Sequence, residues 1–266
     1  MLIAPQTVAT ANLHRSAGRL PESGMGPIYD GAGDPEAPIS VSLLRLASGS
    51  SERFQVEGQE TAAIVLSGAG ELRAGSASAV FRRPSWIDRP PTVAHASGGT
   101  AVEVHADEPS ELIVIRTPNP QRFESRVVPA ARVREEQRGR GKVFDAAHRL
   151  VRTAFDGSDS PPATRLVIGE VITFPGRWSS YPPHHHPQPE LYYYRFDRPQ
   201  GYGHAECGDE VYKVREHDVL RIPGGKDHAQ CAAPGYHMYY LWAIRHLDGA
   251  RYAGFETTPD HRWTFE

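Results

Sequence analysis

The sequence predicts an all-β protein built from two β-barrels in tandem, and three observations lead to this prediction. The 266 residues include 25 glycines and 23 prolines, which separate short apolar stretches as they do in barrels and sandwiches. Segments with helical periodicity are scarce. A polar, arginine-rich stretch at 118–142 divides the chain, and the apolar pattern of the first half returns in the second.

In the first half, short apolar runs between turn-forming residues predict strands at 41–46, 62–66, 101–104 and 111–115. Gly68 and Gly70 are expected to mark a tight turn. The polar stretch that follows is typical of a surface connection between domains. The predicted units are therefore an N-terminal barrel, a linker and a C-terminal barrel, at residues 1–125, 126–145 and 146–266.

In the second half, the same reasoning predicts strands at 165–174, 190–196, 219–222 and 238–244. Successive side chains of a strand point to opposite faces. One face of 190–196 should therefore carry Glu190, Tyr192, Tyr194 and Phe196. The other should carry Leu191, Tyr193 and Arg195. If Glu190 binds a metal ion inside a barrel, the aromatic side chains on the same face of the strand line the interior of that barrel.

Composition and charge argue against several classes of protein. A net charge of -3 lacks the basic excess of a nucleic-acid-binding protein, so a small-molecule ligand is the better expectation. No span approaches the roughly 20 apolar residues that cross a bilayer, and Met1–Gln6 has no signal-peptide pattern. Two cysteines, Cys207 and Cys231, are too few for a disulfide scaffold. These features predict a cytoplasmic protein.

Histidines and a glutamate in the second half predict a metal site. His184 and His186 are two residues apart and would point to the same side of a strand, with His185 facing away. Glu190 would add an oxygen ligand, and His228 follows a Pro-Gly-Gly turn as a third nitrogen ligand. Three nitrogens and one carboxylate suit Zn²⁺, Fe²⁺, Mn²⁺ or Ni²⁺.

The first half offers no comparable set of ligands. Nine of the thirteen histidines lie between His184 and His261. The first half has His14, His95 and His105, without a His-x-His pair or a matched carboxylate, so these are expected to be surface or core residues.

The ligand spacing resembles the cupin motifs, in which a small double-sheet barrel holds a metal ion. Longer stretches resemble one family, the 5-deoxy-glucuronate isomerases of inositol catabolism (IolB), related to the 5-keto-4-deoxyuronate isomerases. In the second half these are Trp178–His184, Glu190–Phe196, Ala233–Tyr236, Met238–Trp242 and Pro259–Trp263. In the first half the resemblance is looser and rests on Val65–Gly70 and Phe81–Asp88.

The resemblance implies a two-cupin chain with a divalent ion, zinc by preference, in the C-terminal barrel alone. It also implies metal-dependent conversion of 5-deoxy-D-glucuronate to 2-deoxy-5-keto-D-gluconate, an aldose-ketose isomerisation. Some positions depart from the family pattern: His185 and Pro187 replace a lysine and an acidic residue, and Gly225–His228 is longer than the usual Gly-Tyr-His. The four ligands are retained, and Lys226 and Asp227 would lie beside the ion, where they bear on which sugar acid fits.

Several residues are candidates for the remaining roles. Glu190, Tyr192 and Tyr240 are candidates for moving the proton. The substrate carboxylate calls for a cation, and Lys226 and Arg251 are the candidates, with Arg245 also open. Arg195 lies on the face opposite Glu190 and is expected to be structural. Exposed sheet edges predict a homo-oligomer.

Two other functions fit the same ligands. A cupin dioxygenase would use iron and oxygen at the three histidines and the glutamate. A sugar-binding cupin without catalysis would keep the ion for structure, and no helix-turn-helix pattern indicates a transcriptional role.

Overall fold

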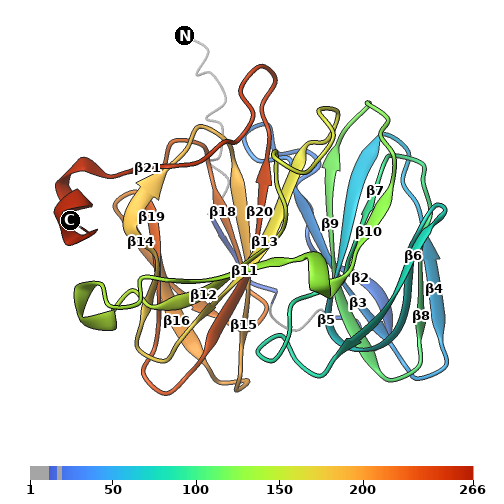
Figure 1. The fold of residues 1–266 in the computed structure, drawn as a ribbon, viewed down its shortest axis with the longest axis horizontal. Helices are drawn as coiled ribbons and strands as arrows, with labels where there is room; N and C mark the ends of the chain where they lie inside the picture. Colours follow the sequence, from blue (N-terminus) through green and yellow to red (C-terminus); the bar gives the residue numbers. More distant parts are fainter. Residues whose placement is uncertain (1–11, 17–19, 266) are drawn as a thin grey trace, which may run out of the picture.

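The computed structural model describes residues 12–16 and 20–265, and Met1–Gln6 lie outside them. Its described part is almost entirely antiparallel β-structure, which confirms the all-β prediction. Two barrels of strands lie side by side (Figure 1). No helix within these described ranges has the length and apolar character to cross a membrane.

The N-terminal barrel is a nine-stranded sheet folded on itself. Its strands are β2 (Gly24–Tyr29), β3 (Ser40–Leu46), β4 (Ser51–Phe54), β5 (Gln59–Ala74), β6 (Ala77–Arg83), β7 (Val93–Ala96), β8 (Val102–Ala106), β9 (Ser110–Pro118) and β10 (Arg126–Val128). All four strands predicted in this half are present. The long strand β5 joins the two sides of the barrel, because it pairs with β7 and β9 near its start and with β6 and β8 near its end.

The prediction of a tight turn at Gly68 and Gly70 is wrong, because both residues lie inside β5. Gly68 has a φ of +109°, and a Cβ there would lie 2.1 Å from Ser110 Oγ. A Cβ at Gly70 would lie 1.9 Å from the carbonyl oxygen of His105. The glycines therefore allow two neighbouring strands to approach β5 where it bends from one side to the other.

The C-terminal barrel combines a seven-stranded and a five-stranded sheet. The first has the order β1 (Leu13–His14), β18 (Val219–Ile222), β15 (Glu190–Phe196), β20 (Met238–Arg245), β13 (Leu166–Thr173), β12 (Arg149–Phe155) and β11 (Arg134–Arg138). The second has the order β17 (Glu210–Arg215), β16 (Tyr202–Cys207), β19 (His228–Ala232), β14 (Trp178–His185) and β21 (Glu256–Thr257). Short 3₁₀ turns occur at η1 (Ala130–Arg132), η2 (Val143–Asp145) and η3 (Pro259–Phe265). All four strands predicted in this half are present.

Segments before and after the N-terminal barrel pair with strands of the C-terminal barrel. The segment predicted as a linker, 126–145, carries β10, which pairs with β7, and β11, which pairs with β12. It therefore supplies one edge strand to each barrel. Strand β1 pairs with β18, so residues 13 and 14 belong to the C-terminal sheet although they precede the first barrel in the chain.

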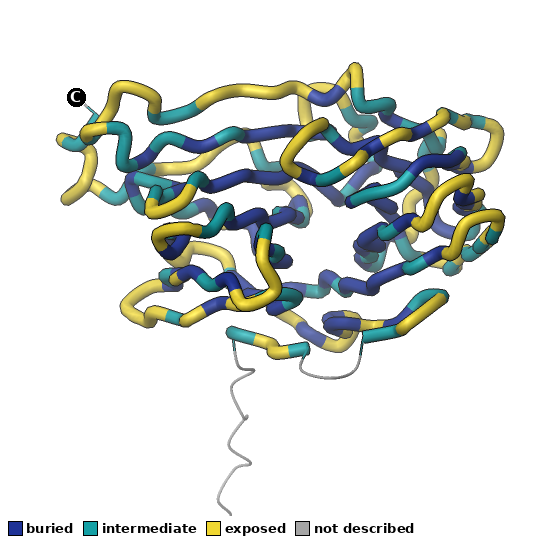
Figure 2. The backbone as a smooth tube through the Cα atoms, turned by 90° about the horizontal axis from the view of Figure 1, so that it is seen from below, coloured by how far each residue is buried: buried dark blue, intermediate teal, exposed yellow. Residues whose placement is uncertain are grey.

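Three apolar clusters form the core, one inside each barrel and one between them. In Figure 2 the buried segments run through the middle of both barrels, and exposure concentrates in the loops. Tyr192 and Tyr194 belong to the interior cluster of the C-terminal barrel, whereas Leu191 and Tyr193 belong to the cluster between the barrels. The predicted alternation along 190–196 is confirmed, and it directs the face of Glu190 into the barrel.

A buried polar network also connects the barrels. Glu170 of β13 accepts hydrogen bonds from Arg83 at 2.5 Å, from Arg152 at 3.0 Å and from Tyr239 at 3.0 Å. The side chains of Arg83, Arg152 and Glu170 are at most 2% exposed. Since Arg83 ends β6 and the other residues lie in the second barrel, this carboxylate fixes one barrel against the other.

Candidate metal centre

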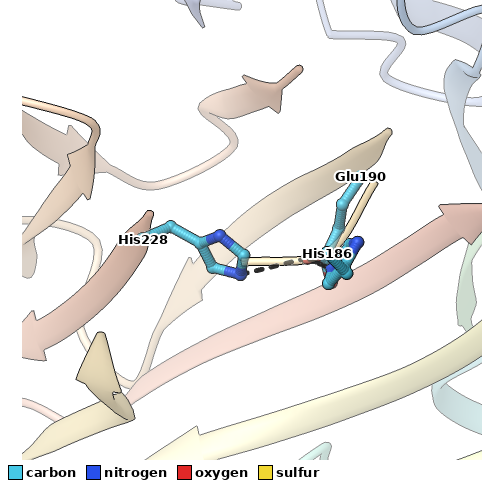
Figure 3. A group of neighbouring side chains, drawn as sticks. All are labelled: His186, Glu190 and His228. Carbon is cyan, nitrogen blue, oxygen red and sulfur yellow. Dashed lines mark hydrogen bonds and ion pairs between the residues drawn. The ribbon is translucent and has the colours of Figure 1, made fainter. Parts of the chain in front are cut away.

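Three side chains from neighbouring strand ends meet inside the C-terminal barrel. His186 follows the last residue of β14, Glu190 begins β15 and His228 begins β19. Glu190 Oε2 lies 3.2 Å from His186 Nε2 and 3.3 Å from His228 Nε2. All three residues are buried, and one potential ligand atom of each lies within 4.8 Å of the others (Figure 3). Such a group can hold a metal ion.

Backbone carbonyls fix the orientation of the histidine rings. His186 Nδ1 lies 2.9 Å from the carbonyl oxygen of Gln188, and His228 Nδ1 lies 2.9 Å from that of Lys226. Because a carbonyl accepts hydrogen bonds, each Nδ1 carries the proton in the neutral ring and donates it. The lone pair of each Nε2 then faces Glu190, which is the tautomer that binds metal ions.

The electrostatics of this group call for a cation. Burial raises the pKa of Glu190, but the adjacent His186 and His228 side chains outweigh that effect and lower it to about 2, so the group is an ionised carboxylate. His228 Nε2 is buried and makes no hydrogen bond of acceptable geometry. A carboxylate and two imidazole lone pairs that face one another in a buried space fit a divalent ion, which would satisfy all three.

His184 lies beside this group but outside it. Its ring centre is 4.5 Å from that of His228, and its Nδ1 lies 3.3 Å from the carbonyl oxygen of Pro182. Burial and the neighbouring His228 lower the pKa of His184 to about 3, so the ring stays neutral as a ligand must. Its role as the fourth ligand remains a prediction. His185 bonds Asp227 Oδ1 at 2.7 Å, which places its ring away from Glu190, as expected.

His184, His186, Glu190 and a set of aromatic side chains line one pocket, and His228 adjoins it through its contact with Glu190. Tyr192 and Tyr240 are fully buried, and their hydroxyls lie 3.3 Å and 3.1 Å from Ser180 Oγ. Burial raises the pKa of Tyr240 to about 12 and that of Tyr192 well above its usual value. Tyr192 and Tyr240, the two tyrosines among the candidates for proton transfer, thus lie beside the metal ligands. Their hydroxyls both contact Ser180.

Part of the pocket wall comes from a segment that the sequence did not single out. The ring of Phe255 is centred 4.1 Å from that of His184, and the ring of Tyr252 is 5.0 Å from that of His186. Strand β21, which follows, pairs with β14 at His184 and His185. The aromatic residues at 252 and 255 were the available signal, but nothing local connects them to the histidines.

Neither residue predicted to bind the substrate carboxylate lines this pocket. Arg251 donates to the carbonyl oxygens of Pro162 and Thr164, and Lys226 is exposed. Arg245 donates to Thr117 of the other barrel. Arg195 bonds Glu111 and Glu216 on the face opposite Glu190, in agreement with the structural role expected for it. The cations of the pocket are instead Arg138 and Arg149, which the sequence reading missed.

Comparisons with curated proteins find relatives along most of the chain. The chain is 29% identical over 251 residues to the 5-deoxy-glucuronate isomerase of Geobacillus kaustophilus (strain HTA426), and the match covers 86% of each protein. It is 27% identical over 264 residues to the protein of that name from Lacticaseibacillus casei, with 92% of this chain and 94% of the relative covered. The relative from Bacillus subtilis (strain 168) is 28% identical over 248 residues.

Solved structures share the fold. An IolB-like protein from Salmonella typhimurium superposes with a TM-score of 0.82 at 24% identity, covering 97% of this chain and all of that one. Oxalate decarboxylase from Bacillus subtilis superposes with a TM-score of 0.67 at 10% identity, covering 95% of this chain and 79% of that one. The tandem-barrel fold is therefore shared well beyond recognisable sequence similarity.

The KduI/IolB family model matches residues 30–264, which include most of both barrels and the cluster at His186, Glu190 and His228. The match extends over nearly the whole described chain, and the curated relatives cover the same length. The chain belongs to the KduI/IolB family.

Proposed function

We propose that this protein is a metal-dependent aldose-ketose isomerase that converts 5-deoxy-D-glucuronate to 2-deoxy-5-keto-D-gluconate in myo-inositol catabolism. The observation that carries the proposal is the alignment of most of the chain with curated proteins named 5-deoxy-glucuronate isomerase. The likeness to oxalate decarboxylase is one of fold alone, at 10% identity. It gives no comparable support for oxygen-dependent or decarboxylating chemistry.

The donor set supports a divalent ion held by His186, Glu190 and His228, with His184 as the proposed fourth ligand. We propose Zn²⁺, since two or three imidazoles and one carboxylate are common zinc ligands, and Fe²⁺, Mn²⁺ or Ni²⁺ would accept the same donors. When bound, the ion would polarise the substrate carbonyl and the neighbouring hydroxyl.

The isomerisation moves one proton from the carbon beside the aldehyde to the aldehyde carbon, and a second proton from the hydroxyl oxygen on that neighbouring carbon to the aldehyde oxygen. The tyrosine pKa is normally near 10, and burial raises that of Tyr240 to about 12, so this hydroxyl stays protonated at neutral pH. Tyr240 and Tyr192, linked through Ser180, are suited to donate hydrogen bonds to substrate oxygens. Glu190 is the remaining candidate for the base that carries the proton between the two carbons.

Two further features support proposals about the cellular compartment and the oligomeric state of the enzyme. Cys207 and Cys231 are free thiols, which fits the reducing cytoplasm. Strand β17 ends the five-stranded sheet and exposes Val211, 64% accessible, so edge-to-edge contact offers a route to the expected homo-oligomer.

The function is tested by incubating the purified protein with 5-deoxy-D-glucuronate in D₂O without oxygen, before and after chelation, and following the reaction by NMR. We expect the 5-keto product, with deuterium at the newly formed hydroxymethyl carbon, in the metal-loaded sample alone. An oxygen requirement would favour a dioxygenase. Tight sugar binding without turnover would favour a non-catalytic cupin, and either result would contradict the proposal.

A further inference from the structure

Arg149 is a buried cation that has no carboxylate partner among the residues that the structure describes. Four arginines of the described chain are buried, and three of them pair with acids: Arg83 and Arg152 with Glu170, and Arg221 with Asp34. Arg149, the first residue of β12, is 7% exposed. Among the described residues its guanidinium donates a hydrogen bond to the carbonyl oxygen of Ala147, at 2.8 Å, and no acidic side chain lies within ion-pair distance.

A buried guanidinium that lacks a counter-ion is costly, because a single carbonyl replaces few of its lost contacts with water. Arginine stays charged in proteins, so it does not relieve this cost by releasing its proton. The cost is offset if an anion binds there, and the guanidinium leaves donors free for two parallel hydrogen bonds to a carboxylate.

The position of Arg149 connects it to the metal ligands. It lines the same pocket as His184, His186 and Glu190. It also lines an adjoining pocket that contains four further cations, Arg138, Arg140, Lys142 and Arg262, and none of the described residues that line it is acidic. Arg138 is its partner across β11 and β12. A positive entrance of this kind attracts anions and leads them toward Arg149.

We propose that Arg149 binds the carboxylate of the substrate and thereby orients the sugar acid with its aldehyde end toward His186, Glu190 and His228. This inference rests on the proposed function for the identity of the substrate. It assigns to Arg149 the role for which Lys226 and Arg251 were candidates, and it makes a terminal carboxylate a requirement for tight binding.

The test compares metal-loaded wild-type protein with Arg149→Met and Arg149→Lys in calorimetric binding of D-glucuronate and of neutral D-glucose. The control is Arg116→Met, because Arg116 is a partly buried arginine that likewise has no acidic partner among the described residues but lies in β9 of the other barrel. We expect wild type and the control to prefer glucuronate. The preference should fall about 10- to 100-fold in Arg149→Met, the range for hydrogen bonds to a charged group. Arg149→Lys should lose less, because it keeps the charge without the paired geometry.

Kinetics with 5-deoxy-D-glucuronate should show the same loss as a higher KM, with kcat changed little, while metal content stays that of wild type. An unaltered KM and glucuronate preference in both Arg149 variants would overturn the inference while leaving the isomerase function intact. The converse result, no turnover by wild type but an Arg149-dependent preference for glucuronate, would overturn the proposed function alone. Inorganic phosphate that displaces glucuronate at equal or lower concentration would also overturn the assignment to a carboxylate.

Discussion

Replacing His228 with alanine is expected to remove the divalent ion from the C-terminal barrel and to abolish isomerisation. His228 Nε2 is buried and faces Glu190 at 3.3 Å, so its loss removes one of the donors grouped around the carboxylate. Loss of a hydrogen-bond partner of a ligand already weakens metal binding about 10- to 100-fold, so loss of the ligand itself should cost about 100-fold or more. The measurement is metal affinity by titration against a competing chelator.

His185→Gln is the matched control, since this histidine neighbours two candidate ligands but bonds Asp227 instead. It should bind the ion as wild type does. Equal metal affinity in His228→Ala and wild type, with both proteins folded, would show that the ion binds elsewhere.

Replacing Glu170 with alanine should lower the free energy of unfolding by about 3–5 kcal/mol, the usual cost of removing one partner from a buried ion pair. Arg83 and Arg152, both 2% exposed, would lose the carboxylate that they share, and Tyr239 would lose its acceptor. Because the network connects the two barrels, the variant should also unfold less cooperatively. Urea denaturation followed by tryptophan fluorescence measures both effects, since Trp86 packs against Tyr239 at this interface.

The control for this variant is Glu103→Ala, which removes an exposed ion pair with Arg53, 2.9 Å long, from the N-terminal barrel. Exposed pairs of this kind contribute about 1 kcal/mol or less. If Glu170→Ala costs no more than Glu103→Ala, the buried network does not hold the barrels together.

The sequence predicted those features of the site that depend on local periodicity. The period of two along 190–196 assigned Tyr192 and Tyr193 to opposite faces, and the structure confirms it. The pattern of His184, His186, Glu190 and the turn before His228 predicted a common site, and the structure brings His186, Glu190 and His228 of this set together.

Features that depend on pairing between distant strands escaped prediction. Arg149 lines the pocket because β12 pairs with β13. No residue near it in the sequence indicates that the metal ligands line the same pocket. Strand β11 lies in the segment predicted as a linker, because that segment is polar and rich in arginine. Four of the five side chains of β11 are exposed, and an edge strand of this kind lacks apolar alternation. Gly68 was predicted to lie in a turn, because a glycine between apolar residues indicates either a turn or a close approach of another strand. Ser110 of β9, which makes that close approach, is distant in the sequence.

The dependence of activity on one ion in one barrel is tested most directly by adding metal back to chelated protein. Elemental analysis would give the bound ion per chain while the 5-deoxy-D-glucuronate isomerase rate is followed. The rate should rise in proportion to bound metal and reach its maximum at one equivalent per chain. A full rate in metal-free protein, or a maximum that needs a second equivalent, would contradict a single metal centre formed by His186, Glu190 and His228.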